Sequence, residues 1–252
     1  MKRKTSAVVV ERNKPILKRI EELKQEHPFW GYRRIWAHLV YVDQIIINKK
    51  RVYNLLKQNN LLINKETRLR AKRKSLRPKP KAKKPNEIWG IDMSKIKTKI
   101  GWVYIVIVLD WYSKKIVGKQ VGLASKTEDW LLALEEGLSK QYPEGVLGKE
   151  LKLVSDNGCQ PTSTRFMKSC NILGIKQVFT SYNNPKGNAE TERSIRTMKE
   201  ELFWIKEWQG VAQVEKALNE WVEKYNKTYL HSSLGYKTPE WAEANAHKLE
   251  VA

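Results

Sequence analysis

Residues 87–121 contain three consecutive runs of strand-like sequence, and these runs restrict the fold more than any other feature. Glu87–Lys97 alternates apolar and polar residues, Trp102–Asp110 is rich in Val and Ile, and Lys115–Val121 is a third run. Short turns separate the runs, so we expect an antiparallel meander. Helices and strands then alternate over Thr127–Gln141 (helix), Leu151–Ser155 (strand), Thr164–Leu173 (helix), Lys176–Phe179 (strand), Asn188–Phe203 (helix) and Val211–Tyr225 (helix). This order predicts an α/β core, a mixed five-stranded sheet flanked by helices.

The composition favours a folded protein and excludes several classes. Hydrophobic residues make up 41% of the 252 residues and include ten Trp and ten Tyr, enough for a core of one medium and one small domain. The longest apolar run is strand-sized, well below the roughly 18 residues of a membrane span, so we expect no membrane association. Cys159 and Cys170 form no CxxC pair, which argues against a zinc framework and fits a reducing cytoplasm.

The net charge of +21 is concentrated in the first third of the chain. Residues 1–64 carry a net charge of +9, residues 65–84 carry +10, and residues 85–252 carry only +2. Positive charge gathered at one end favours binding of a polyanion there. We therefore predict a helical DNA-binding domain (1–64), an extended basic linker (65–84) and a catalytic domain with a C-terminal helical extension (85–252). A solvated basic tail would also explain the charge of the linker. If the linker follows a phosphate backbone, the residues expected to contact it are Lys72, Arg73 and Lys74.

The first 64 residues show three short helical patterns, Lys14–Glu26, Tyr32–Val40 and Lys49–Gln58, with Asn48 as the N-cap of the third. The side chains expected to face inward are Ile35, Trp36, Leu39, Val52, Leu55 and Leu56. Three helices that end in a basic one indicate a helix-turn-helix whose last helix enters a major groove, although any charged three-helix bundle has the same pattern. The candidate DNA contacts are Arg33, Arg34, Lys49, Lys50, Arg51 and Asn54.

Three carboxylates are the candidate catalytic residues. Asp92 stands inside a strand, Asp156 follows the end of a short apolar strand, and Glu192 lies in the first turns of a long helix. If that helix packs beside the strands, the carboxylates form a cluster of hard oxygen ligands that suits Mg²⁺ or Mn²⁺. Each residue also has an ordinary explanation, respectively an edge-strand charge, a turn and a favourable charge at a helix start, so the triple alone is a weak signal.

Motifs along nearly the whole chain carry a family resemblance. They are HPFWGYRRI at 27–35, NKKRV at 48–52, WGID at 89–92, SDNG at 155–158, 187–199 around Glu192, YN at 225–226, His231 and LGYKTP at 234–239. With 35 residues between Asp156 and Glu192, the chain resembles the retroviral-integrase superfamily, in particular the orfB-type transposases of bacterial insertion sequences. The resemblance implies an RNase H-like core with an Asp-Asp-Glu triad, preceded by a helix-turn-helix.

The resemblance also implies an activity and its partners. It implies a polynucleotidyl transferase in which Asp92, Asp156 and Glu192 hold two Mg²⁺ (or Mn²⁺) ions and cut and join DNA at the element's ends. Lys199, two helical turns after Glu192, is expected to hold a terminal phosphate, unless it is an ordinary lysine of a salt-bridged helix. Further DNA contacts are expected from Arg196 and Asn157. The expected partners are terminal inverted repeats, target DNA, further copies of the chain and an upstream-frame protein, at the nucleoid.

The resemblance leaves some alternatives open. Glu190 is a spare carboxylate near the proposed site, but its spacing from Asp156 is two residues short of the family's, and Glu192-Arg193 matches the motif better, so Glu192 is preferred. Two other functions remain possible at this stage: a catalytically silent DNA-binding regulator of the element, and an RNase H-like nuclease that cuts an RNA–DNA hybrid or a junction.

Overall fold

The computed structural model describes residues 7–63, 81–180 and 187–246. The chain divides into two compact units, Met1–Lys72 and Arg73–Ala252, which are described separately. The expected linker contacts Lys72, Arg73 and Lys74 lie outside the described residues. The domain boundaries inferred from charge therefore stay a prediction.

The N-terminal unit consists of helices α1 (Ala7–Glu26), α2 (Tyr32–Tyr41) and α3 (Lys49–Gln58). Helix α1 begins seven residues before the predicted start at Lys14 and contains Pro15, so the proline did not mark a boundary. The three helices share one buried core, to which they contribute Ile20, Leu23, Ile35, Leu39, Val52, Leu55 and Leu56. Trp36, expected to face inward, is only half-buried, because its indole N–H donates to the Ile47 carbonyl at 2.7 Å and the ring lies under Lys49.

The second unit is built on a five-stranded sheet in the order β3-β2-β1-β4-β5. Its strands are β1 (Ile88–Thr98), β2 (Gly101–Asp110), β3 (Ile116–Gly122), β4 (Lys152–Ser155) and β5 (Lys176–Phe179). The first three strands pair antiparallel, whereas β4 pairs parallel with β1 and with β5. The predicted mixed five-stranded sheet is confirmed.

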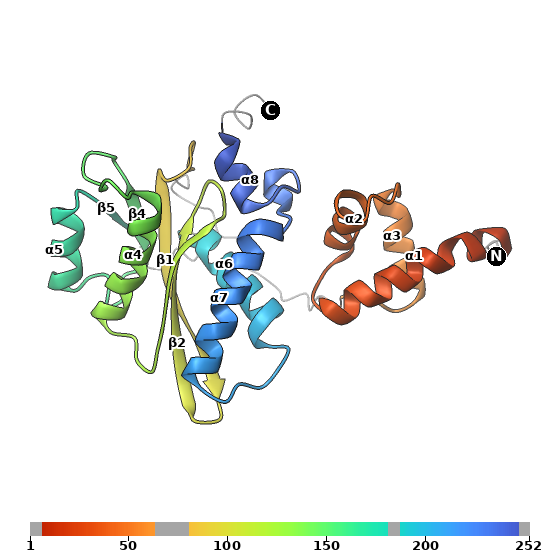
Figure 1. The fold of residues 1–252 in the computed structure, drawn as a ribbon, viewed down its shortest axis with the longest axis horizontal. Coiled ribbons are helices and arrows are strands. Elements are labelled where there is room, and N and C mark those ends of the chain that lie inside the picture. The colour runs from red at the N-terminus through yellow and green to blue at the C-terminus, as the bar shows by residue number, and fades with distance from the viewer. Residues whose placement is uncertain (1–6, 64–80, 181–186, 247–252) are drawn as a thin grey trace, which may run out of the picture. The chain divides into compact units, whose positions relative to one another are not determined.

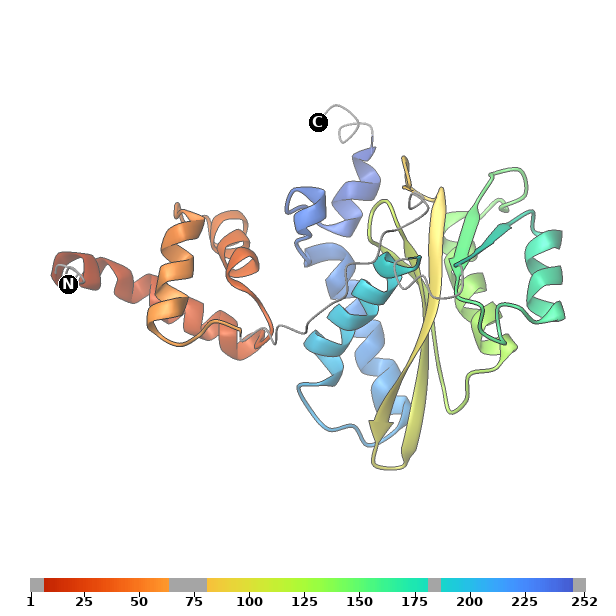
Figure 2. The same cartoon turned by 180° about the vertical axis from the view of Figure 1, so that it is seen from behind.

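Helices cover both faces of this sheet (Figure 1). Helices α4 (Thr127–Gln141) and α5 (Thr164–Ile172) lie on one face, while α6 (Ala189–Met198) and α7 (Val211–Thr228) lie on the other, as the reverse view also shows (Figure 2). A π-helical turn, η1 (Lys199–Phe203), a 3-10 turn, η2 (Ser232–Leu234), and α8 (Pro239–Ala244) complete the unit. Each strand alternates between two cores, so in β2 the odd-numbered Val103 to Leu109 face α6 and α7 and the even-numbered Val106 and Val108 face α4.

The C-terminal signature residues fasten α7 to the sheet. The buried Asn226 side chain accepts a hydrogen bond from the Ile116 amide and donates one to the Ile116 carbonyl, both at 3.0 Å. The Tyr225 hydroxyl donates to the Lys114 carbonyl at 3.1 Å. Helix α7 runs three residues past the predicted end at Tyr225, and Thr238 caps α8, a short helix that the periodicity did not predict. None of the described helices is both long and apolar enough to cross a membrane.

Candidate active site and nucleic-acid interface

The two aspartates stand at equivalent positions on neighbouring parallel strands. The β1–β4 ladder ends at the pair formed by Gly90 and Val154. Asp92 and Asp156 each lie two residues beyond that pair, at the carboxyl ends of the paired segments. Because side chains alternate along a strand, Asp92 points to the same sheet face as Gly90, the face covered by α6.

A glycine allows α6 to approach this face closely. A Cβ atom on Gly90 would lie 1.9 Å from the Thr191 hydroxyl oxygen, 2.3 Å from Nε1 of Trp111 and 2.9 Å from Oδ1 of Asn188. The Thr191, Trp111 and Asn188 side chains occupy the space beside Gly90. They form two buried hydrogen bonds, from the Trp111 indole to Thr191 at 3.0 Å and from the Asn188 amide to the Ile91 carbonyl at 3.2 Å. These contacts, called the Gly90 lock below, fix the first turn of α6 against β1.

The first turn of α6 carries both candidate glutamates, and they have different surroundings. Glu190 pairs with Lys114 at 3.0 Å, beside the turn that joins β2 to β3. Glu192 is two residues further along, and two residues rotate a helix by about 200°. The negative charge of Glu192 raises the pKa of Asp92. The two glutamates therefore have different surroundings, and the choice of Glu192 as the catalytic one stays a prediction.

Asp92 is the electrostatic centre of the site. It is half-buried, and its Oδ1 accepts the Met93 amide at 2.8 Å. Burial raises the pKa of Asp92 from 3.8 to about 7; the Met93 amide lowers it, the negative charges of Asp156 and Glu192 raise it further, and Lys199 lowers it. Asp156, Glu192 and Lys199 thus all lie within electrostatic range of Asp92.

The chemistry of these donors fits a divalent cation. Among the described residues, no three His, Cys, Asp or Glu side chains are gathered closely enough to enclose a metal ion as they stand. Asp156 and Glu192 are exposed, however, and both already oppose ionisation of Asp92. A divalent cation relieves this repulsion, and carboxylate oxygens are the ligands that Mg²⁺ prefers.

Known families match both units of the chain. Two models described as Integrase core domain match residues 82–185 and 173–239, which together span more than half of the chain, and an HTH-like domain matches residues 11–68. The chain belongs to the integrase core family. Asp92 and Asp156 lie within the matched segment 82–185, and Glu192 lies within the matched segment 173–239.

Relatives of this integrase are named transposases. The chain is 31% identical over 162 residues to the transposase for insertion sequence element IS904 of Lactococcus lactis. This alignment covers 63% of this chain and 62% of that protein. It is 27% identical over 228 residues to the IS629 transposase of Shigella sonnei, and 26% identical over 233 residues to transposase InsD for IS2 of Escherichia coli. These alignments cover 87% and 89% of this chain, and 75% and 76% of the relatives.

A solved structure supports the fold of the integrase. A chain in the simian T-cell lymphotropic virus intasome complex superposes with a TM-score of 0.55 at 17% identity, over 86% of this chain and 71% of that chain. The predicted RNase H-like integrase core with a preceding helix-turn-helix is confirmed as the fold class.

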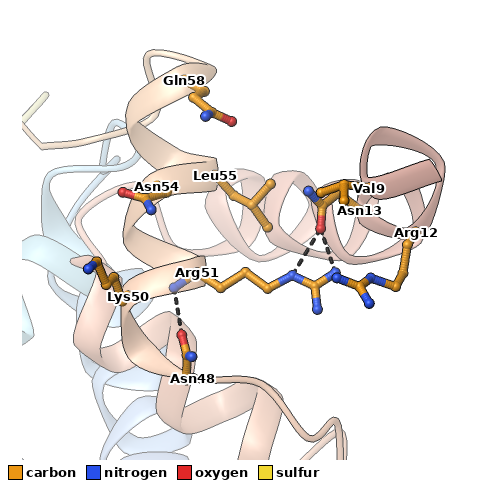
Figure 3. Close-up of a pocket in the computed structure, with 9 residues that line it drawn as sticks. All are labelled: Val9, Arg12, Asn13, Asn48, Lys50, Arg51, Asn54, Leu55 and Gln58. Atoms are coloured by element: carbon orange, nitrogen blue, oxygen red, sulfur yellow. Dashed lines mark hydrogen bonds between the residues drawn. The ribbon is translucent and has the colours of Figure 1, made fainter. Parts of the chain in front are cut away.

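In the N-terminal unit, a polar cleft lies between α1 and the predicted recognition helix α3 (Figure 3). The cleft has a volume of about 320 Å³. Arg51 extends from α3 to Asn13 on α1, and Asn13 Oδ1 accepts from both Nε and Nη2 of the guanidinium, at 2.9 and 2.5 Å. Arg12 and Lys50 also line the cleft, whose lining contains no carboxylate, so it is a concave basic surface.

The other predicted DNA contacts have varied surroundings. Lys49 lies over the Trp36 ring at 4.1 Å and Arg34 over the Trp30 ring at 5.8 Å. Asn54 is exposed on α3, and the exposed Arg33 bonds to the neighbouring Tyr32 hydroxyl at 3.1 Å. In the integrase core, Arg196 pairs with Glu200 at 2.7 Å, and Asn157 donates to the Thr180 carbonyl. Their contacts with DNA stay a prediction.

Sequence reasoning missed the Gly90 lock. Asn188 was expected only as the start of a helix, and Thr191 and Trp111 were not singled out. Two weak signals were available, since a glycine inside a strand often marks close approach of another segment and a polar residue at a helix start often bonds to backbone. Neither signal names the partner, because Trp111 and Thr191 are 80 residues apart in the chain.

Proposed function

We propose that this chain is a transposase that cuts DNA at the ends of an insertion sequence and joins the freed ends to target DNA. Asp92, Asp156 and Glu192 are its catalytic residues. The observation that carries the proposal is the electrostatic interaction of Asp92 with both Asp156 and Glu192. These three residues lie far apart in the chain. The transposase names of the relatives agree with it.

The three carboxylates would hold two Mg²⁺ or Mn²⁺ ions, whose chemistry is to activate the attacking oxygen and stabilise the leaving oxygen of a phosphodiester. Within this arrangement, α6 keeps Glu192 beside β1 through the Gly90 lock. Lys199 interacts with Asp92 from the end of α6 and would place its ammonium group on a DNA phosphate. A water oxygen attacks the phosphorus first, and the freed 3′-hydroxyl then attacks a second phosphodiester.

The N-terminal unit would recognise the ends of the element. Helix α3 presents Lys50, Asn54 and Lys57 on its exposed side, while Val52, Leu55 and Leu56 bury the opposite side. Such a helix, preceded by α2, is the arrangement that inserts into a major groove. We propose terminal inverted repeats as its ligand, with oligomers of the chain, and an upstream-frame protein where one exists, holding two ends together at the nucleoid.

The test uses the full chain, a labelled duplex that carries the ends of its own element, and Mg²⁺ or Mn²⁺. Joined products are expected from the wild-type protein. Glu192→Gln should abolish cleavage and joining while leaving a shifted DNA band. Glu190→Gln is the matched control. It removes the same charge from a glutamate only two residues away, whose carboxylate pairs with Lys114.

The outcomes separate the proposal from its competitors. Cleavage without joining would indicate a nuclease, and a shifted but intact band for the wild type would indicate a DNA-binding regulator. If Glu190→Gln and Glu192→Gln lose activity equally, the assignment of Glu192 is wrong. If Glu192→Gln loses DNA binding and cleavage together, its role is structural.

A further inference from the structure

A basic and aromatic patch lies at the tip of the β1–β2 hairpin. Trp102 on β2 is a large side chain with 44% of its surface exposed. The ammonium groups of Lys95 and Lys97, both on β1, lie over its ring at 4.7 and 5.3 Å from the centroid. Among the described residues, neither lysine forms an ion pair. These three residues are called the hairpin patch below.

The sheet leaves this patch uncovered. Alternation along β1 and β2 places the three side chains on the α4 face, but α4 packs mainly on β3. The pairing of β3 with β2 reaches only Gly122 opposite Tyr104, two residues short of Trp102. Between Met93 and Leu109 the sequence contains three lysines and no Asp or Glu. The exposed end of the hairpin therefore combines positive charge with an aromatic surface.

The hairpin patch lies on the same strand as Asp92. Beyond the Gly90–Val154 pair, β1 is no longer paired with β4 and forms an edge. Lys95 is three residues past Asp92, about 10 Å at 3.3 Å per residue, and Trp102 pairs with Lys97 about 17 Å away. Asp92 lies on the α6 face and the patch on the α4 face, so a DNA strand that contacts both runs around this edge. Since a DNA strand advances by about 3.4 Å per nucleotide, the patch lies at least about three to five nucleotides from the reacting phosphate.

We propose that the hairpin patch binds the DNA strand that flanks the reacting phosphate, with Lys95 and Lys97 on its backbone and Trp102 stacked on a base. The proposal rests on the proposed function, because it takes Asp92 as the position of the reacting phosphate. Charge and shape favour nucleic acid over a protein partner. Unpaired lysines beside an exposed indole are the combination that binds single-stranded or unpaired nucleotides without sequence preference.

The first test is photocrosslinking with the full chain. DNA end substrates carry 5-iodouracil at successive positions on either side of the cleavage site, and the crosslinked peptide is identified by mass spectrometry. A crosslink to Trp102 is expected from a position at least about three nucleotides beyond the cleavage site. Crosslinks that avoid the peptide containing Trp102 at every position would overturn the proposal.

The second test measures affinity for DNA that extends beyond the cleavage site. Trp102→Ala should weaken binding by between about fivefold and a hundredfold, the range for loss of one base–aromatic stack. Trp102→Phe should retain most of the affinity. Because Trp102 is partly buried, thermal melting must first show that Trp102→Ala is folded; if it is not, the comparison uses the lysine variants alone.

Charge has its own matched control. Lys95→Gln with Lys97→Gln should lower the salt dependence of binding, reducing the slope of log affinity against log salt by about 1.4 for two contacts with a single strand. Lys168→Gln with Lys176→Gln removes the same charge from exposed positions on α5 and β5, across the sheet. Equal effects of both pairs would mean a general loss of attraction and would overturn the proposal.

The results also distinguish this inference from the proposed function. A wild-type protein that crosslinks through Trp102 but never cleaves DNA would contradict the transposase and leave the patch as a DNA-binding surface. Active cleavage with normal binding by the hairpin variants would contradict the patch and leave the transposase intact.

Discussion

Replacing Gly90 with alanine tests whether the seat of α6 on β1 controls the catalytic site. The added Cβ would lie 1.9 Å from the Thr191 hydroxyl oxygen and 2.3 Å from Nε1 of Trp111, whereas real Cβ contacts essentially never fall below 3.0 Å. Helix α6 must therefore retreat from β1 by about 1 Å, or these side chains must rotate away. Either response breaks the buried hydrogen bond between Trp111 and Thr191.

The size of the effect follows from these contacts. Overpacking costs about 1–3 kcal/mol, and a buried donor left without its acceptor costs about 1–3 kcal/mol. We expect the free energy of unfolding to fall by about 2–6 kcal/mol, the sum of the two costs. Because Glu192 moves with α6 while Asp92 stays on β1, and a misplacement of 1 Å can cost about 100-fold in rate, cleavage should slow by about 100-fold.

The assay compares Gly90→Ala with Gly118→Ala at a temperature where circular dichroism shows both folded. A Cβ on Gly118 would lie 2.0 Å from the Ala133 carbonyl oxygen on α4, a similar clash on the opposite face of the sheet. Gly118→Ala should lose stability and keep its cleavage rate. Thr191→Ala, which removes the closest clashing atom, should restore part of the activity when combined with Gly90→Ala.

Two results would refute this reasoning. Normal cleavage by folded Gly90→Ala would show that the position of α6 does not limit catalysis. Equal losses of cleavage in the Gly90 and Gly118 variants would show that general destabilisation, and not displacement of α6, lowers the rate.

Three further predictions concern titration, the C-terminal anchor and the N-terminal cleft. Because the pKa of folded Asp92 is raised to about 7, the folded protein binds more protons than the unfolded chain between about pH 4 and 7. In EDTA the melting temperature of the protein should therefore fall as pH rises through that window, and it should fall less in Asp92→Asn. Stabilisation by added Mn²⁺ should grow towards pH 7 and above, where protons no longer compete for the carboxylate. A response to Mn²⁺ that does not depend on pH would count against Asp92 as a ligand. Asn226→Ala leaves both backbone groups of Ile116 without partners and should lower the free energy of unfolding by about 2–3 kcal/mol in urea, with cleavage unchanged when measured on folded protein. Asn13→Ala releases the guanidinium of Arg51 and should change affinity for the element's ends more than affinity for unrelated DNA in gel-shift titrations; equal changes on both DNAs would mean that Asn13 does not orient a specificity contact.

The sequence predicted those parts of the fold that depend on local patterns. Alternating apolar residues identified β1, a run rich in Val and Ile identified β2, and the apolar spacing of α3 identified Val52, Leu55 and Leu56 as its buried side. These features follow from periodicity, since a strand or an amphipathic helix exposes its preference within a few residues. The early start of α1 and the short α8 were missed, because tertiary contacts extend or create helices that local signals do not mark.

The choice of Glu192 over Glu190 shows what the sequence and the tertiary structure each decided. Spacing and the motif around Glu192 preferred it, and only the fold showed that Glu190 pairs with Lys114 while the charge of Glu192 raises the pKa of Asp92. The Gly90 lock was likewise decided by tertiary structure, because it joins residues about 80 to 100 positions apart whose proximity no local pattern encodes. The chain's pattern determines which elements form; the packing of α6 on β1 determines which side chains surround Gly90 and Asp92.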